Sequence, residues 1–527
     1  MKGNGASLVR RRPHPGKPRW RKAAAAFAVG LAVVSLTAAC GGGTGSGSAD
    51  RVLNIGFPVP PESMDPAKLS TDASLYANLA YDPLIYRAPD GSLQPRLATS
   101  WNYVGTGNKL FELKLRPDVR FSDGSPLTAD VVKTNIEHFK KTSSSASLLA
   151  AVASIEAPDP LTVRVSLSQP NPILPVLFTQ DFLAGNVASG PALAQPDTLA
   201  TQSAGAGPYV LDPATTVSKD HYTYVPNPQY WNKNAVHYDR VVVKVLTNAN
   251  TALAAIKTGQ VDVLRADYTT ADAAKSAGLQ IAQTPLSFIG LNLTDRAGQL
   301  VPALGDVRVR QALNYAVDRQ KITKALFGDY GTPTEQIQLP GEDGYNPQDF
   351  YGHDPAKARQ LLAEAGYPNG FTLPVLTRTT RGTDLVIQAM ADDLKQVGVQ
   401  VQLTTQPDFQ KYTQDLTSGK YPAYGVLAGA LPIYAMGQLL FLPNASVYNP
   451  QKSSDDQLQS LYEQASVADD ANRARLDQQV VRRLVELAWL VPVVFTPNLY
   501  YSRPMVGGVE ATAKEPKANP VEWFPKS

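Results

Sequence analysis

Short runs of alternating apolar and polar residues predict β-strands in this chain. Residues 111–116 place Phe111, Leu113 and Leu115 on one face and charged side chains on the other, and 163–167 and 399–403 repeat the alternation. Successive side chains of a strand point to opposite faces, so this pattern is typical of strands with one buried face. The run 241–246 is almost continuously apolar, which predicts a strand covered on both faces.

Apolar residues at helical spacing predict helices in five other stretches. Asp306 precedes the first, and its side-chain oxygen can cap a helix whose apolar positions are 309, 312, 313, 316 and 317. Asp354-Pro355 predicts the start of the second and Gly366 its end. Apolar stripes over 387–394, 458–465 and 476–487 predict the others. Strands and helices therefore mix throughout, which predicts an α/β or α+β fold rather than a helix bundle or a β-sandwich.

The N-terminal stretch has the layout of a bacterial secretory signal. Its first 22 residues carry many basic side chains and no acid, and the following uncharged run ends in the small residues Thr37-Ala38-Ala39. That run, 23–39, is short and rich in alanine, whereas a stable membrane span needs about 20 clearly apolar residues. We therefore expect 1–39 to be a signal peptide that is removed after export.

Cys40 is the one cysteine of the chain, and it follows the expected cleavage site directly. It resembles the acylated first residue of a bacterial lipoprotein, although Leu36 lies one place further from the cysteine than is usual. The alternative is an ordinary buried or free cysteine. A Gly/Ser-rich tether, 40–50, would then connect the lipid to the folded body. Two acyl chains would anchor the protein at the outer face of the cell membrane. Arg11-Arg12 leaves general and twin-arginine export both open.

Charge and composition exclude several classes of function. The whole chain has a formal net charge of +3, but the basic residues concentrate in the signal, so the remainder is net acidic. Nucleic acid is therefore not an expected partner. With one cysteine, neither a disulfide framework nor a thiolate metal site is expected. The chain is long enough for two or three domains.

Several sequence blocks resemble the family 5 extracellular solute-binding proteins, the peptide and nickel receptors of ABC importers. Each block alone is weak, but together they follow the order of the family along most of the chain. Residues 115–132, which read LRPDVRFSDGSPLTADVV, are the most specific. The others are 61–66, 81–86, 94–101, 205–209, 227–231 and 306–313.

The resemblance implies a two-lobed periplasmic-binding-protein-like α/β fold of type II, in its large cluster C form, with an extra subdomain inserted in lobe I. We expect the chain to cross between the lobes near 288–292 and 491–501. Lobe I would comprise 51–88, 205–287 and 491–527, the inserted subdomain 89–204, and lobe II 293–490. A cleft between two lobes can close on a small ligand and remove it from water.

No catalytic constellation accompanies these blocks. The five histidines form no H-E-x-x-H pair, and the chain has no phosphate-binding loop and no Gly-x-Ser-x-Gly elbow. We expect no enzymatic activity, no cofactor and no metal site. A secreted hydrolase would need a nucleophile–base pair that the sequence lacks, and a scaffold protein with a degenerate cleft is a further alternative.

The resemblance assigns ligand-binding positions to segments that line the cleft in relatives. Phe409 stands where relatives commonly have a tryptophan, and 58–62 and 495–498 match other cleft segments. Packing alone is the alternative for each of them. The expected ligand-binding residues are Pro60, Glu62, Phe409, Ala430, Ile433, Tyr434, Phe495 and Asn498.

The stretch 428–434 departs from the peptide-binding relatives. Their aspartate, which pairs with the α-ammonium of a peptide, is replaced by Ile433, and Ala430 stands at a tryptophan position. A buried ammonium without a counter-charge is costly to desolvate. Either another acid replaces that aspartate, or the ligand has no ammonium. The candidate acids are Glu62, Asp65, Asp408 and Asp415.

These observations predict a monomeric, lipid-anchored receptor that delivers a solute to the transmembrane subunits of an ABC permease. Peptides of the oligopeptide or dipeptide class are the expected ligands. A saccharide, a siderophore-like compound or a metal chelate is the alternative.

Overall fold

The computed structural model describes residues 51–429, 431–443 and 448–526. The expected signal peptide 1–39, Cys40, the tether 40–50 and Ala430 lie outside the described residues, so those predictions stay untested. Within the described ranges, no helix combines the length and the apolar character needed to cross a membrane.

Among the described residues, the largest sheet has 11 strands and runs from one side of the fold to the other. Its order is β15-β14-β16-β12-β17-β11-β1-β10-β9-β8, and β13 pairs with β17. In chain order the strands are β1 (Val52–Phe57), β8 (Tyr209–Leu211), β9 (His221–Pro226), β10 (Arg240–Val245), β11 (Val263–Ala266), β12 (Gln280–Leu293), β13 (Thr332–Pro333), β14 (Thr372–Thr377), β15 (Gln400–Thr405), β16 (Ala423–Gly429) and β17 (Leu490–Ser502).

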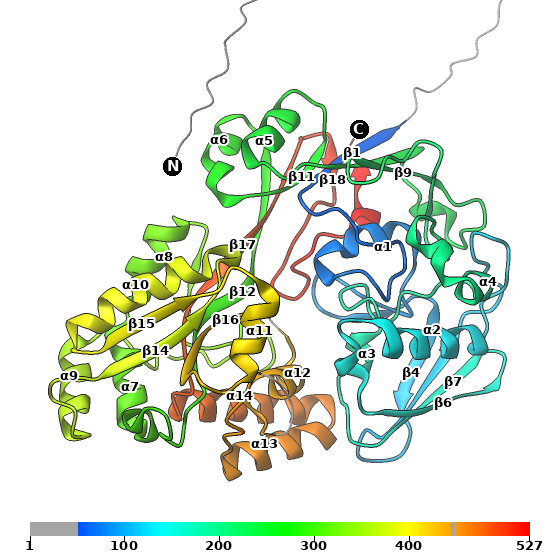
Figure 1. Ribbon diagram of the computed structural model, residues 1–527. Coiled ribbons are helices and arrows are strands. Elements are labelled where there is room, and N and C mark those ends of the chain that lie inside the picture. The colour runs from blue at the N-terminus through cyan, green and yellow to red at the C-terminus, as the bar shows by residue number, and fades with distance from the viewer. Residues whose placement is uncertain (1–50, 430, 444–447, 527) are drawn as a thin grey trace, which may run out of the picture. The chain divides into compact units, whose positions relative to one another are not determined.

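Strands β12 and β17 connect the two parts of this sheet. They are antiparallel and pair from Gln280 opposite Ser502 to Asn292 opposite Leu490. β17 also pairs with β11, and β12 with β16 (Figure 1). The two ranges expected to cross between lobes, 288–292 and 491–501, lie within these strands. We call the part with β1–β11 the first lobe and the part with β13–β16 the second lobe.

The first lobe holds a second, antiparallel sheet of the order β4-β5-β7-β6. One continuous hydrophobic core joins this sheet to β1 and α1. The remaining strands of this lobe and of the C-terminal segment are β2 (Ile85–Arg87), β3 (Leu93–Pro95), β4 (Ala98–Tyr103), β5 (Leu110–Leu115), β6 (Val152–Asp159), β7 (Thr162–Leu167), β18 (Val506–Gly507) and β19 (Phe524–Pro525). Its helices are α1 (Ser74–Ala80), α2 (Ala129–Thr142), α3 (Leu174–Leu177), α4 (Gly190–Ala194), α5 (Ala249–Lys257) and α6 (Ala271–Ser276).

In the second lobe, helices surround strands β14–β16 and bury two further hydrophobic cores (Figure 1). One core contains α7, α9 and α10, and the other contains α13 and α14. The helices are α7 (Val307–Ala316), α8 (Arg319–Phe327), α9 (Pro355–Glu364), α10 (Thr383–Gln396), α11 (Phe409–Thr417), α12 (Ile433–Met436), α13 (Asp456–Val467) and α14 (Asp470–Glu486). A π-helix, Gly437–Phe441, extends α12.

The predicted strands and helices are present. In α7 the Asp306 side chain accepts a hydrogen bond from the Arg308 N–H, and Val309, Ala312 and Leu313 are buried as expected. One expectation was wrong in part: β10 is not covered on both faces. Val241 and Val243 are buried, whereas Val242 is half-buried, because a surface hollow lined by Val242 and His221 opens on that side.

Candidate ligand-binding site

A cavity of about 840 Å³ lies between the two lobes. The first lobe contributes a hydroxyl- and amide-rich wall that includes Ser144, Ser147 and Asn171, and the second contributes Tyr434 and Gln438. Leu286 and Ser287 of the connecting strand β12 also line the cavity. Charged side chains of both signs also line it: Asp72, Arg87, Asp181, Glu342, Arg381 and Lys517.

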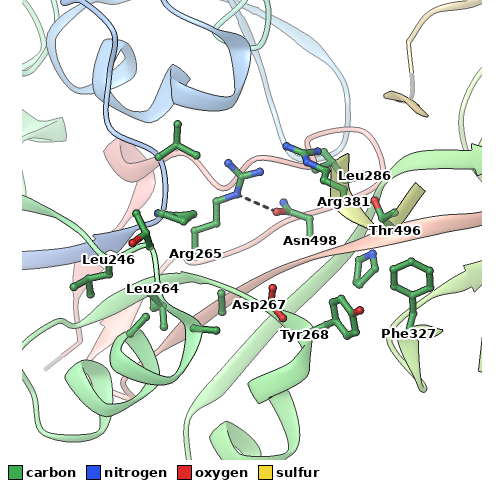
Figure 2. A pocket seen from close by; sticks show the side chains of 18 of the residues that line it. Leu246, Leu264, Arg265, Asp267, Tyr268, Leu286, Phe327, Arg381, Thr496 and Asn498 are labelled. Carbon is green, nitrogen blue, oxygen red and sulfur yellow. Dashed lines mark hydrogen bonds between the residues drawn. The ribbon is translucent and has the colours of Figure 1, made fainter. Parts of the chain in front are cut away.

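A smaller cavity of about 510 Å³ adjoins it, and Leu286 and Arg381 line both. Figure 2 shows this smaller cavity with Arg265, Arg381, Tyr268 and Phe327 around it. Arg265 Nε donates a hydrogen bond to Oδ1 of Asn498 at 3.3 Å. The remaining wall is largely apolar, with leucines from both lobes.

An ion-pair network joins the lobes where the two cavities meet. Arg381 Nη2 of the second lobe donates a hydrogen bond to Oδ2 of Asp72, and Arg265 Nη2 lies 3.7 Å from Oδ1 of the same carboxylate. Burial raises the pKa of Asp72, but the charges of Arg381, Arg265 and Lys517 outweigh this and hold the pKa below its usual value. Asp72 is therefore ionised and paired with cations from both lobes.

Two further acids line the larger cavity near Arg87. Asp181 Oδ2 lies 3.5 Å from Arg87 Nη1, and the Asp181 side chain is 10% exposed. Glu342 Oε2 accepts a hydrogen bond from the Leu339 N–H at 3.0 Å. Burial raises the pKa of Glu342 to about 7, partly offset by this hydrogen bond and by the charge of Arg87. Burial also lowers the pKa of Lys517, whose ammonium donates to the backbone oxygen of Thr71 at 2.7 Å.

Polar contacts hold the lobes together around the larger cavity. Tyr434 Oη donates to the backbone oxygen of Pro170 at 2.6 Å, and its ring stacks on Tyr462 with centroids 5.3 Å apart. Asn108 Nδ2 donates to the backbone oxygens of Ser466 and Ala468 at 3.0 and 3.2 Å. The lobes are thus in direct contact, and Tyr434 of the larger cavity takes part in that contact.

The sequence-predicted site residues fall in different places. Tyr434 lines the larger cavity and Asn498 the smaller one. Ile433 and Phe495 are each 1% exposed and pack in a second-lobe core.

The other predicted residues line neither cavity: Pro60 is half-buried, and Glu62 and Phe409 are exposed. Ala430 lies outside the described residues. The ligand-binding role of each of these residues stays a prediction.

Three of the four acids suggested as substitutes for the missing aspartate have other partners. Asp65 Oδ2 lies 2.8 Å from His138 Nε2, and Asp408 Oδ1 caps α11 through the Lys411 N–H at 2.7 Å. Asp415 accepts from the ammonium groups of Lys411 and Lys420, and these hydrogen bonds lower its pKa to about 2. Glu62 points to solvent.

Sequence reasoning missed the charged residues that do line the larger cavity. Asp72, Asp181, Glu342, Arg381 and Lys517 are spread over more than 400 positions and belong to no motif. No local pattern signalled them, because Asp72, Asp181 and Lys517 meet only through the folding of the first lobe, and Glu342 and Arg381 reach them from the second. Within the described ranges, no group of three potential ligands is placed to hold a metal ion.

Comparison with known proteins shows which family this chain resembles. Residues 92–444 match the model of the bacterial extracellular solute-binding proteins, family 5 middle region. The glutathione-binding protein GsiB of Salmonella typhimurium (strain LT2) is 30% identical over 319 residues, which cover 56% of this chain and 57% of GsiB. The chain thus matches little more than half the length of that relative.

Two solved structures share the fold over most of the chain. HbpA2 from Haemophilus parasuis matches with a TM-score of 0.78 and 24% identity, covering 90% of this chain and 100% of HbpA2. AgaA from A. tumefaciens R10, in complex with agropinic acid, matches with a TM-score of 0.72 and 24% identity, covering 90% of this chain and 99% of AgaA. These matches confirm the expected two-lobed α/β fold.

Members of the matched family are binding proteins rather than enzymes, which agrees with the expectation from the sequence. The family match covers more than half of the chain, and the cavity between the lobes is where such a protein would enclose a solute. The chain therefore belongs to the bacterial extracellular solute-binding proteins of family 5.

Proposed function

We propose that this protein is the substrate-binding component of an ABC importer and that it encloses a peptide of the oligopeptide or dipeptide class between its lobes. The observation that carries the proposal is the cavity of about 840 Å³ lined from both lobes by charges of both signs. A peptide has an ammonium and a carboxylate, and each needs a counter-charge when it leaves water. The glutathione-binding relatives support this ligand class, because glutathione is a tripeptide derivative.

Binding works by a shift between open and closed arrangements of the lobes. A ligand that contacts both walls favours the closed arrangement by its differential affinity for it. The transmembrane subunits of the permease then receive the closed form. The proposed lobe bounds remain 51–88, 205–287 and 491–527 for lobe I, 89–204 for the inserted subdomain and 293–490 for lobe II.

The ligand can be identified from the protein itself. Native mass spectrometry of protein purified without denaturation should show an added mass that collisional activation releases as a peptide. Adding that peptide to stripped protein should raise the melting temperature, since a ligand of the native state stabilises it by mass action. A released saccharide, siderophore-like compound or chelate would instead support the alternative ligand class.

The lipid anchor is a separate part of the proposal. A diacylglyceryl group on Cys40 would keep the exported protein, as a monomer, at the outer face of the membrane by its lipid alone. Mass analysis of the mature N-terminus should find this modification at Cys40. Cys40→Ala should release the protein into the medium or periplasm, while a protein that stays bound after this change would contradict the anchor.

A further inference from the structure

We propose that Asp181 and Glu342, on opposite walls of the larger cavity, form the subsite that binds the ammonium group of the ligand. This inference rests on the proposed function and names a part of its site. Ile433 replaces the aspartate that pairs with the ammonium in peptide-binding relatives. Asp181 and Glu342, which belong to no sequence motif, would bind the ammonium in its place.

Asp181 presents an accepting oxygen that lacks a hydrogen bond. Its side chain is 10% exposed, and among the described residues no group donates a hydrogen bond to its buried Oδ2. The nearest cation is Arg87, at 3.5 Å, which is beyond good hydrogen-bond length, and the charges of Lys517 and Glu515 also interact with this carboxylate. A buried carboxylate oxygen without a donor is costly, so a site of this kind is completed by a donor from a ligand. An ammonium group brings three such donors.

Glu342 faces the same cavity from the second lobe. It follows Leu339, which packs with Ile433 in a second-lobe core, whereas Asp181 precedes Phe182 of the first-lobe core. One Glu342 oxygen accepts from the Leu339 N–H. An ammonium between Asp181 and Glu342 would therefore contact both lobes and favour their closed arrangement.

Charged groups of both signs act on Glu342. Arg87 and Lys514 are the basic groups that act on it, and Asp343 is the acidic one. Arg87 forms an ion pair with Asp181, and its charge also acts on Glu342, so two acids share this cation. Because burial raises the pKa of Glu342 to about 7, a bound cation would favour the ionised form and release a proton near neutral pH.

The remaining acid of this cavity is already neutralised. Asp72 interacts with Arg381, Arg265 and Lys517. At the position of Ile433, the side chain is apolar and 1% exposed, so it offers nothing to a cation. Among the acids that line this cavity within the part of the chain described, Asp181 is the one with a buried carboxylate oxygen that has no hydrogen-bond partner, and Glu342 faces it from the other lobe.

The test compares two charge-removing variants with a matched control. Asp181→Asn and Glu342→Gln keep the shape of each side chain, and Asp197→Asn removes an exposed acid outside the cavity. An equimolar tripeptide library is offered with free N-termini and, separately, with acetylated N-termini. Native mass spectrometry identifies the retained peptides. Isothermal titration calorimetry gives their affinities, and its repetition in buffers of different ionisation enthalpy gives the number of protons released on binding. Near-ultraviolet circular dichroism confirms that each variant is folded.

The proposal expects free-amine peptides to bind the native protein and Asp197→Asn equally. Acetylation, Asp181→Asn and Glu342→Gln should each weaken binding by about 30-fold or more, since each leaves a buried charge without its partner. In a double variant that combines Asp181→Asn with Glu342→Gln, acetylation should have little further effect. Binding at pH 6.5 should release protons in the native protein and not in Glu342→Gln.

Two results would overturn the subsite in different ways. If free and acetylated peptides bind the native protein and both variants alike, the subsite is wrong while the peptide receptor stands. If the library is not retained but an uncharged saccharide such as maltotriose is, the subsite and the peptide class both fail. If neither is retained and the protein purified without denaturation also carries no small molecule, the proposed function itself is contradicted.

Discussion

The guanidinium of Arg381 donates a hydrogen bond to the carboxylate of Asp72, across 309 positions of the chain and from one lobe to the other. Arg265 and Lys517 act on the same carboxylate. This network lies at the boundary between the two cavities. Together with the hydrogen bonds from Tyr434 to Pro170 and from Asn108 to Ser466, it connects the lobes directly. The contacts allow several predictions about closure, packing and pH dependence.

Arg381→Gln should loosen the contact between lobes with little effect on folding. The Arg381 and Asp72 side chains are 36% and 39% exposed, so solvent screens the pair and its contribution to the free energy of unfolding is below about 1 kcal/mol. Small-angle X-ray scattering of ligand-free protein should give a larger radius of gyration for the variant. Arg308→Gln, which removes a surface pair with Asp306 inside the second lobe, is the control. An unchanged radius of gyration would contradict the role of this pair in closure.

Ile433→Asp should destabilise the protein and should not create a peptide anchor. The Ile433 side chain is 1% exposed and packs beside Val481 and Gly344. Burying a carboxylate there without a partner should lower the free energy of unfolding by about 3 kcal/mol or more. Ile433→Val, which only removes a methylene, should cost about 1 kcal/mol. Denaturant unfolding measures both, and a gain in peptide affinity in a stable Ile433→Asp protein would argue against the Asp181–Glu342 subsite.

Glu515 should make the protein less stable as pH rises. Burial, together with the charge of Asp181, raises its pKa to about 8, above the ordinary value of 4.5. The folded chain therefore keeps a proton between about pH 4.5 and 8 that the unfolded chain has lost, so stability falls through this range and levels off above it.

Glu515→Gln should remove this pH dependence. It should match the native stability near pH 4.5 and exceed it at pH 8 by about 4 kcal/mol. The amide oxygen can still accept the hydrogen bond from Gln180 Nε2. Glu510→Gln, at an exposed position, should change stability little at either pH. Equal effects of Glu515→Gln at both pH values would show that the acid is ionised in the fold.

Gly290→Ala should weaken the connection between lobes. A Cβ at this position of β12 would lie 2.2 Å from the backbone oxygen of Val491 in β17, at an irregularity in their pairing. The strands would have to separate, and we expect a loss of about 2–4 kcal/mol in the free energy of unfolding. Gly429→Ala in the neighbouring β16 meets no atom within 4 Å and serves as the matched control. Comparable stability of the two variants would contradict the close approach.

The sequence alone determined the helices and strands of this protein, and its sequence blocks indicated the family. The alternation over 111–116 gave β5, in which Phe111, Leu113 and Leu115 are buried, and the Asp306 and Asp354 caps marked the starts of α7 and α9. These features depend on neighbours within a few positions, so periodicity and capping predict them. The half-exposed face of β10 was missed, because strand periodicity does not report what covers each face.

The tertiary structure alone decided which side chains meet in the cavity. Asp181 follows a short helix of the first lobe, and Glu342 lies in a loop of the second, yet both act on Arg87. No spacing in the sequence relates them, since their proximity depends on the long pairing of β12 with β17 and on the closure of the lobes. The family resemblance indicated where a ligand would lie, but the charges available to hold it result from contacts between residues far apart in the chain.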